Sequence, residues 1–327
     1  MINSDERILR FTIMQDHVGK SLSGFLSSRF TYHTSAEWID LVGSGAVLLN
    51  GAVSSADYIL AEGDSIQYCT ANTPEPCIDS EVSVIFEDKD IIVLNKTGNL
   101  PVHPGGRYFN HTLWKILKDR FNVAEPVIIN RLDRETSGVT LVAKNPHAAK
   151  ICRQQFNARS VTKKYTVLVE GAFPASVHSC GYLTADSRSV IRKKQRFEPS
   201  DVSASVPERS SQWADTMFTV KERLDGISII EAILHTGRLH QIRATLEFLG
   251  YPVVGDKMYG LDEGIFLRFC QDALTHADIS KMRIQRQALH AAELVFRHPI
   301  GGRAMTLIAP LPLDMQELIN TCTKSRR

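Results

Sequence analysis

The chain has 327 residues and a mass of 36.5 kDa, about twice the size of one typical domain, so we expect two domains. Its 43% hydrophobic and 23% charged residues are typical of a globular protein and exclude a disordered or collagen-like chain. No apolar run reaches the ~18 residues of a membrane helix, and the acidic N-terminus has no signal core, so we expect a soluble, cytoplasmic protein.

The charge is unevenly distributed along the chain. Residues 1–80 contain 4 Lys and Arg residues against 10 Asp and Glu residues, a net charge of −6. The other 247 residues contain 34 basic and 26 acidic residues, a net charge of +8. If the protein binds a polyanion, the C-terminal part should therefore provide most of the attraction.

The N-terminal part has the pattern of a small αβ domain. Residues 21–30 and 35–42 can each form a short amphipathic helix. Residues 46–50 are expected to form a strand that leads into a turn at Gly51.

A linker is expected after this domain. The segment 70–80 combines two prolines with small polar residues and shows no hydrophobic periodicity. We therefore predict domains over 1–73 and 82–327, joined by a linker over 74–81.

Downstream of the linker, short apolar runs alternate with helical patterns. The runs predict strands at 82–86, 91–95, 127–129, 139–143, 165–169 and 227–234. Helices are predicted at 111–121, 146–158 and 241–249, and an exposed loop at 199–212. Several strands follow one another too closely for helical crossovers, so we predict an α+β fold with a mixed, largely antiparallel sheet.

Local signatures of several enzyme classes are missing from the sequence. There is no GxxxxGK[ST] phosphate loop, no GxGxxG after a strand, no HExxH and no GxSxG. The six cysteines are widely spaced and form no CxxC pair, so we predict reduced thiols and no zinc site.

Polar clusters occur at the ends of the predicted strands. The stretch 130–138 (NRLDRETSG) separates two apolar runs, and charges held there must find partners. It is either an Arg–Asp pair that closes a turn or a loop that carries chemistry. The stretch 236–243 (TGRLHQIR) is either an ordinary solvated helix start or a helix N-terminus that, with its two arginines, binds an anion such as phosphate.

Further basic residues accompany these clusters. At Lys163-Lys164-Tyr165 the tyrosine either packs in the core or stacks on a nucleic-acid base. The stretches 103–107, 188–196 and 281–286 are either solvated faces or the lining of an RNA-binding groove.

Taken in order, these segments resemble the RluA-type family of RNA pseudouridine synthases over nearly the whole chain. The family's first segment is matched by IIVLNKTGNLPVHPGG, its catalytic loop by NRLDRETSGVTLVAKN and its tyrosine strand by KKYTVLVEG. Its third motif is matched by TGRLHQIRATLEFLGYPVVGDKMYG and its last core strands by ALHAAELVFRHPIGG. Residues 12–70, with VLLNG and EGDSI, resemble a small RNA-binding module named after a small-subunit ribosomal protein, here called the S4-like module.

The resemblance implies that the protein isomerises uridine to pseudouridine in ribosomal or transfer RNA, as a monomer and without a metal or organic cofactor. The family aspartate falls on Asp133, which would attack the ribose or the base, or abstract a ribose proton. Arg243 would keep that carboxylate ionised. Tyr165 would stack on the uracil and help to remove the proton from carbon five.

The resemblance also implies a set of RNA contacts. Arg131 would hold a phosphate or fill the space left by a flipped nucleotide. The other expected contacts are His103, Arg107, Lys164, Arg192, Lys193, Lys194, Arg238, His240 and Gln241.

One position departs from the family pattern, because Asn130 stands where the catalytic loop usually begins with histidine. Asparagine keeps a donor and an acceptor but cannot titrate, so activity survives if the histidine only positions RNA. Two rival hypotheses remain, a non-catalytic RNA-binding or ribosome-assembly protein on the same fold and an Asp-dependent hydrolase that uses His240. A pseudouridine synthase predicts that Asp133 lies within about 4 Å of Arg243, with the Tyr165 ring facing the same cleft.

Overall fold

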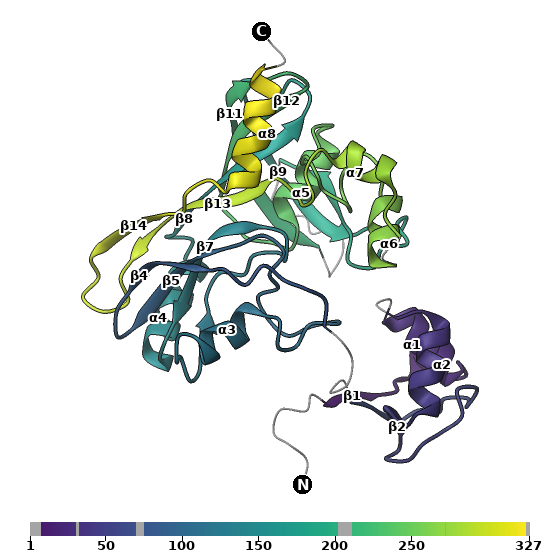
Figure 1. The fold of residues 1–327 in the computed structure, drawn as a ribbon. Coiled ribbons are helices and arrows are strands. Elements are labelled where there is room, and N and C mark those ends of the chain that lie inside the picture. The colour runs from purple at the N-terminus through teal and green to yellow at the C-terminus, as the bar shows by residue number, and fades with distance from the viewer. Residues whose placement is uncertain (1–7, 31–32, 70–74, 202–210, 272, 325–327) are drawn as a thin grey trace. The chain divides into compact units, whose positions relative to one another are not determined.

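The computed structural model describes residues 8–30, 33–69, 75–201, 211–271 and 273–324. These form two compact units (Figure 1), the first made of Met1–Cys77 with Pro104–Asn110 and the second of Ile78–His103 with His111–Arg327. None of the helices in the described ranges combines the length and the apolar character needed to cross a membrane.

The N-terminal unit is a three-stranded antiparallel sheet with helices. Its elements are β1 (Ile8–Thr12), η1 (Gln15–His17), α1 (Leu22–Arg29), α2 (Ser35–Gly43), β2 (Val47–Leu49) and β3 (Ser65–Cys69), with the sheet order β1-β3-β2. The helix starts follow from their caps: Ser21 accepts a hydrogen bond from the Gly24 amide, and Thr34 and Glu37 form a capping box. The predicted helices at 21–30 and 35–42 and the strand at 46–50 are confirmed.

The segment Pro104–Asn110 joins this unit although the sequence places it far from residues 1–77. The Glu75 carboxylate accepts hydrogen bonds from the backbone amides of Phe109 and Asn110, both at 2.8 Å. The predicted boundary at 74–81 contains the end of Met1–Cys77, but a boundary drawn along the chain could not include this returning segment.

The larger unit is built on one 11-stranded sheet with the order β10-β9-β11-β12-β8-β13-β7-β5-β4, to which β14 adds on β13 and β6 on β7. The only parallel pair among these strands is β13 with β7, so the predicted mixed, largely antiparallel sheet is confirmed. The strands are β4 (Ser83–Glu87), β5 (Ile91–Lys96), β6 (Val127–Ile128), β7 (Ser137–Ala143), β8 (Thr162–Glu170), β9 (Ser176–Ala185), β10 (Gln195–Pro199), β11 (Gln212–Arg223), β12 (Ile227–Leu234), β13 (Leu289–Arg297) and β14 (Ala304–Ile308).

The end of this sheet that contains β7, β5 and β4 is covered on both faces at β5. Ile91 and Val93 of β5 pack in one cluster with residues of α4 (Pro146–Asn157), whereas Ile92 and Leu94 pack in another with residues of α3 (Leu113–Asp119). A strand buried on both faces needs apolar residues at successive positions, which explains the continuous run that predicted it.

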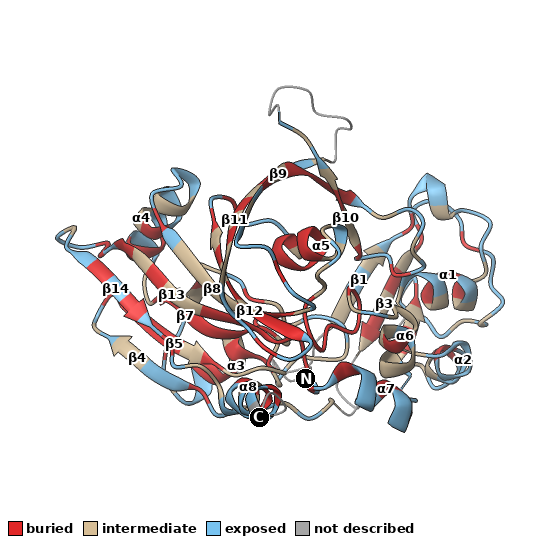
Figure 2. Ribbon diagram, turned by 90° about the horizontal axis from the view of Figure 1, so that it is seen from above, coloured by how far each residue is buried: buried red, intermediate tan, exposed pale blue. Residues whose placement is uncertain are grey.

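At the other end the sheet curls around a buried helix. Figure 2 shows α5 (Gln241–Phe248) within the curve of β9, β10 and β11, with most of its length buried. The remaining helices, which the sequence analysis did not predict, are α6 (Gly264–Cys270), α7 (His276–Met282) and α8 (Leu313–Lys324). Most of the predicted exposed loop at 199–212 lies outside the described residues; β10 ends at its first residue, Pro199, and β11 begins at its last, Gln212.

Candidate active site

Asp133 lies in the loop between β6 and β7 and bonds to α5. Arg243 donates from Nη1 to Asp133 Oδ2 at 2.8 Å, and His240 Nε2 lies 4.0 Å from the same oxygen. The Asp133 side chain is 27% exposed, and its Oδ1 has no hydrogen-bond partner among the described residues. Burial raises the pKa of Asp133, but Arg243 and His240 outweigh burial and hold the pKa below its ordinary value. The loop therefore presents an ionised carboxylate with one free oxygen.

Arg243 is held from behind by a second carboxylate. It donates from Nε and Nη2 to the two oxygens of Asp256, at 2.6 and 2.9 Å. Asp256 Oδ1 also accepts the backbone amides of Met258 and Tyr259, at 2.9 and 3.0 Å. The Tyr259 ring covers the guanidinium, whose central carbon lies 4.8 Å from the ring centroid. These contacts orient the guanidinium and leave Nη1 to face Asp133.

His240 is held in a neutral form beside the carboxylate. It precedes α5 with a φ of 56°, in the left-handed region. Burial and the Arg243 charge lower the pKa of His240 to about 4, so the ring is uncharged at neutral pH. Its Nδ1 lies 2.9 Å from the Tyr259 hydroxyl, which accepts the Gln195 amide at 2.7 Å and so has its own proton to donate to Nδ1. This pairing assigns the imidazole proton to Nε2, the nitrogen nearer Asp133.

Tyr165 lies on β8 close to the same carboxylate. Its half-buried ring packs against two core clusters, and its hydroxyl has no hydrogen-bond partner among the residues that the structure describes. Burial and the Asp133 charge both raise the pKa of Tyr165, so the phenol is neutral. The predicted ion pair of Asp133 with Arg243 is confirmed. The charge of Asp133 also acts on the pKa of Tyr165.

Each of the residues 134–137, which follow Asp133, forms a hydrogen bond to a side chain from elsewhere in the chain. Lys96 is fully buried and donates from Nζ to the carbonyl oxygens of Leu100 and Arg134, at 2.9 and 3.1 Å. Burial and the neighbouring Arg286 lower the pKa of Lys96 to about 7. Further anchors are Lys257 Nζ to Glu135 Oε1 at 2.8 Å, Gln287 Nε2 to Thr136 Oγ1 at 2.6 Å and Ser137 Oγ with His290 Nδ1 at 2.9 Å.

Comparisons with known proteins agree with this arrangement. A family model described as RNA pseudouridylate synthase matches residues 90–248, which include Asp133, Tyr165 and Arg243. The chain is 31% identical to RNA pseudouridine synthase YlyB of Bacillus subtilis, over 96% of this chain and 98% of that protein. This protein belongs to the RNA pseudouridine synthase family.

Further similarities extend over the length of the chain. Ribosomal large subunit pseudouridine synthase D of Zymomonas mobilis is 29% identical, with 97% of this chain and 98% of that protein covered. The solved structure of human RNA pseudouridylate synthase domain containing 1 superposes with a TM-score of 0.56 at 25% identity, over 76% of this chain and 97% of that one. The predicted enzyme class is confirmed. The family membership favours it over the rival hypotheses of a non-catalytic RNA-binding protein and of a hydrolase.

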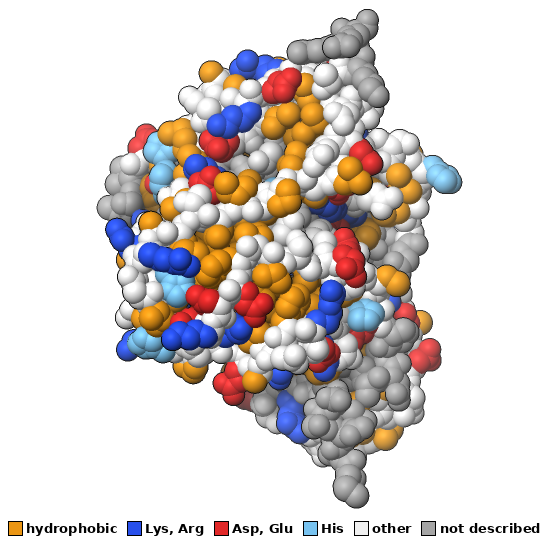
Figure 3. All heavy atoms as spheres, turned by 60° about the vertical axis from the view of Figure 1, so that its left-hand side comes forward, with side chains coloured by type: hydrophobic (Ala, Val, Ile, Leu, Met, Phe, Trp, Pro, Cys, Tyr) orange, Lys and Arg blue, Asp and Glu red, His pale blue; other side chains and the backbone are white. Residues whose placement is uncertain are grey.

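Several of the RNA contacts predicted for this pseudouridine synthase are exposed. They are His103, Arg131, Arg192, Lys193 and Arg238. Burial and the Arg131 charge lower the pKa of His103, while Arg131 itself has no hydrogen bond or ion pair with a described residue. On the face shown in Figure 3, Lys and Arg side chains are interspersed with Asp and Glu.

Two other predicted RNA contacts, Lys194 and Gln241, are buried and bonded to other residues of this pseudouridine synthase. Lys194 is buried, and its ammonium lies 2.8 Å from Glu247 Oε1 and 3.0 Å from Glu263 Oε2. Gln241 is buried, accepts from Thr236 Oγ1 at 2.8 Å and donates to Thr216 Oγ1 at 2.8 Å. Against the sequence prediction, both side chains hold α5 in the curl of the sheet.

Lys164 and Arg107, two more of the predicted RNA contacts, each interact with an acidic residue. Lys164 precedes Tyr165 on β8, and successive side chains of a strand point to opposite faces. Its ammonium pairs with Glu293 on β13, at 2.8 Å. Arg107 belongs to the N-terminal unit, where its charge lowers the pKa of Glu37 after the stronger effect of hydrogen bonds from Thr34.

Asn130, the departure from the family pattern, faces a strand. Its Nδ2 donates to the Val139 carbonyl at 2.9 Å, and its Oδ1 accepts the Leu141 amide at 2.7 Å. Both amide groups are thus used to continue the pairing of β6 with β7.

Sequence reasoning missed the residues that support Arg243 and the loop after Asp133. Asp256 and Lys257 lie between the apolar pairs Val253-Val254 and Met258-Tyr259. Two charged residues inside an apolar run must find buried partners, and this signal could have identified them as part of the site.

Proposed function

We propose that Asp133 carries out the isomerisation of uridine in this pseudouridine synthase. The observation that supports the proposal is the ionised carboxylate whose Oδ2 is bound by Arg243 and whose Oδ1 has no partner among the described residues, within electrostatic reach of Tyr165. Attack on the ribose, attack on the base and abstraction of a ribose proton all require such an oxygen.

The neighbouring groups divide the remaining tasks. Arg243 keeps Asp133 ionised in a partly buried position, and its bidentate bond to Asp256 keeps it there while substrates enter and leave. Tyr165 offers a ring on which a flipped uracil can stack. Because its pKa is raised, we assign the hydroxyl to hydrogen bonding in the neutral form.

RNA is held by exposed cations in this proposal. Arg131 lies two residues from Asp133, so it can bind a phosphate next to the target nucleotide or fill the space that nucleotide leaves. Lys193 is close enough to His240 to lower its pKa, after the larger effects of burial and Arg243, and so lies within electrostatic reach of the site. Arg192 and Arg238 would extend the contact along the strand.

Ribosomal RNA is the proposed substrate, with transfer RNA as the alternative. The similarity to the Zymomonas mobilis large-subunit enzyme over nearly the full length of both chains supports this choice. We further propose that the enzyme acts as a cytoplasmic monomer and that residues 1–73 are the S4-like module. Its antiparallel strands and two capped helices form the small αβ domain expected of that module.

The catalytic assignment is tested with Asp133→Asn. We expect no pseudouridine in RNA after incubation, with RNA affinity kept within a few-fold, because the substitution removes a negative charge and not a phosphate contact. Asp225→Asn makes the same chemical change at an exposed turn and should leave turnover unchanged. Turnover by a pure Asp133→Asn preparation would refute the mechanism.

The substrate is tested in cells that lack the protein. Chemical mapping of pseudouridine across ribosomal and transfer RNA should show one or a few ribosomal sites lost, and the wild-type gene but not Asp133→Asn should restore them. Loss only in transfer RNA would overturn the ribosomal assignment and leave the catalytic one intact.

A further inference from the structure

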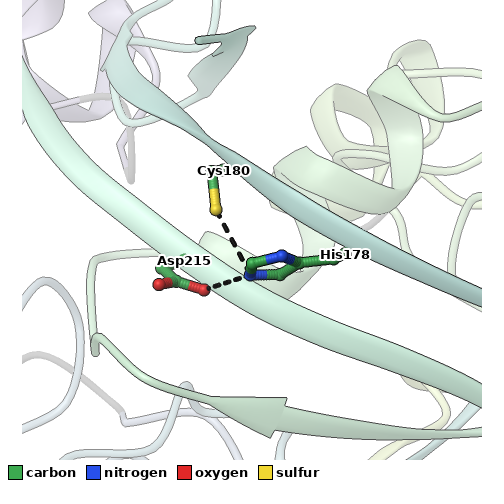
Figure 4. Close-up of side chains that lie close together, drawn as sticks. All are labelled: His178, Cys180 and Asp215. Carbon is green, nitrogen blue, oxygen red and sulfur yellow. Dashed lines mark hydrogen bonds and ion pairs between the residues drawn. The ribbon is translucent and has the colours of Figure 1, made fainter. Parts of the chain in front are cut away.

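Three side chains of different chemistry meet on the curled part of the sheet. His178 Nε2 lies 3.0 Å from Asp215 Oδ1 and 3.3 Å from Cys180 Sγ, and Figure 4 shows the thiol and the carboxylate both directed at this nitrogen. One atom from each residue lies within 4.8 Å of one atom from each of the others. None of the three has been given a part in the isomerisation.

The sheet itself brings these residues together. Cys180 of β9 is directly opposite Asp215 of β11 in the antiparallel register. His178 is two residues before Cys180 on the same strand, so the two side chains share a face. The donors therefore stand on paired strands and need no loop movement to converge.

A catalytic Cys-His-Asp triad does not fit this geometry. In a triad the nucleophile and the carboxylate use different ring nitrogens of the histidine, whereas here both contact Nε2. The three donor atoms instead converge around one point.

We propose that His178, Cys180 and Asp215 bind a divalent transition-metal ion of the zinc class. Imidazole, thiolate and carboxylate are the ligands that zinc takes in proteins, and the mixed set disfavours Mg²⁺ and Ca²⁺, which bind oxygen. Tetrahedral zinc with bonds of about 2.0–2.3 Å holds neighbouring donors about 3.3–3.6 Å apart. His178 Nε2 lies 3.0 Å from Asp215 Oδ1 and 3.3 Å from Cys180 Sγ, within a few tenths of an ångström of these distances, and the third pair, Sγ and the Asp215 carboxylate, lies within 4.8 Å.

Charge and access also favour a cation here. A thiolate and a carboxylate together balance the charge of a divalent ion. The His178 side chain is 52% exposed, so an ion can enter and a water molecule can take the fourth position. The sequence analysis predicted no zinc site because it searched for closely spaced cysteines, whereas these ligands are 35 residues apart along the chain between Cys180 and Asp215.

The site is connected to the start of α5. The Asp215 amide donates to Thr236 Oγ1 at 2.9 Å, and Gln241 Nε2 donates to the Asp215 carbonyl at 3.1 Å. Because the chain around Asp215 supports the helix that carries Arg243, a bound ion should stabilise this region. Binding to the native state alone raises the temperature of unfolding.

Metal binding is tested on the full chain, freed of purification tags and treated with chelator. We expect one equivalent of Zn²⁺ to bind and to raise the unfolding temperature. Co²⁺ should give the d–d spectrum of a four-coordinate site together with a thiolate-to-cobalt charge-transfer band. A wild-type protein that shows no thiolate band with Co²⁺ would overturn the proposal without any variant.

Substitutions locate the site. Cys180→Ser should abolish the charge-transfer band and weaken Zn²⁺ binding by about 100-fold or more, because it removes the soft ligand. Asp215→Asn should weaken binding to a smaller degree. Cys69→Ser, another partly buried cysteine on a strand but in the N-terminal unit, is the matched control and should change neither measurement. Equal Zn²⁺ affinity in wild type and Cys180→Ser would show adventitious binding elsewhere and refute the site.

Discussion

The side chain of Asn130 continues the hydrogen bonding between β6 and β7 at the point where the backbone turns into the loop before Asp133. Ile129 donates its amide to Leu141 at 2.9 Å, and the Asn130 amide group then bonds to Leu141 and Val139. A carboxamide has the same donor and acceptor as a peptide group, so it can substitute for one in a sheet. At this position the enzyme uses the residue to shape the loop before Asp133.

Asn130→Asp tests this role. The variant keeps the acceptor for Leu141 but loses the donor and places a charge against the Val139 carbonyl, which should destabilise the larger unit by about 1–3 kcal/mol. Thermal and denaturant unfolding measure the loss. Asn157→Asp exchanges the same groups at the exposed C-terminal end of α4 and should cost less than about 1 kcal/mol, from the helix dipole alone. An Asn130→Asp protein as stable as the wild type would show that these hydrogen bonds contribute little.

At the scale of the element, the catalytic loop is held in place by partners that lie far along the chain. Thr136 is buried and its hydroxyl accepts from the buried Gln287, at 2.6 Å. The Thr136 amide also donates to the Asp133 carbonyl at 3.1 Å, which closes the turn that carries the carboxylate. A change at Thr136 should therefore be felt at Asp133.

Thr136→Val removes the acceptor and leaves the buried Gln287 amide without its partner. We expect a loss of stability of about 1–3 kcal/mol and a lower turnover, with RNA affinity little changed. The double variant Thr136→Val/Gln287→Leu removes both polar groups, and it should recover part of the stability because no orphan donor remains. A loss of stability in the double variant equal to the sum of the losses in Thr136→Val and Gln287→Leu alone would contradict a direct coupling.

Local patterns predicted some elements of this fold and missed others for physical reasons. Strands buried on both faces, such as β5 and β7, have continuous apolar runs that stand out in the sequence. β9 and β11, by contrast, mix His, Cys, Asp and Thr with apolar residues because part of one face is exposed. Their pairing depends on long-range register, which no local period reveals.

The same distinction applies to the active site. The resemblance to a family identified Asp133, Tyr165 and Arg243, and the ion pair it implied is present. The resemblance could not show that Lys194 forms salt bridges with Glu247 and Glu263. These salt bridges form only because the curl of the sheet brings β10 against α5. Burial of a charge is a property of the folded chain and not of the residue type.

At the scale of the whole molecule, the two units differ sharply in charge. Residues 1–80 carry a net charge of −6 against +8 for the other 247 residues, and Trp38, a residue that could stack on a base, is fully buried in the core of the N-terminal unit. Tyr32, another candidate for stacking, lies outside the described residues. Trp38 is therefore not available to stack on a base of the target RNA.

The salt dependence of RNA binding separates the contributions of the two units. Each phosphate neutralised on single-stranded RNA adds about 0.7 to the slope of log K against log salt. Arg10, Lys20 and Arg29 are exposed basic residues of the N-terminal unit, and replacing all three by Gln should change the slope by less than ~1. Three exposed cations of the larger unit, Arg131, Arg192 and Lys193, serve as the matched set.

Replacing this second set by Gln should lower the slope by about 2, because each cation is expected to neutralise one phosphate. Binding isotherms of both variants on a stem-loop that contains the target uridine, across a salt series, measure the two slopes. A decrease of about 2 in the salt slope of the N-terminal variant would show that the acidic unit binds RNA phosphates through these three cations. In that case the unit would bind RNA directly despite its net negative charge, since counterion release depends on the phosphates contacted and not on the overall charge.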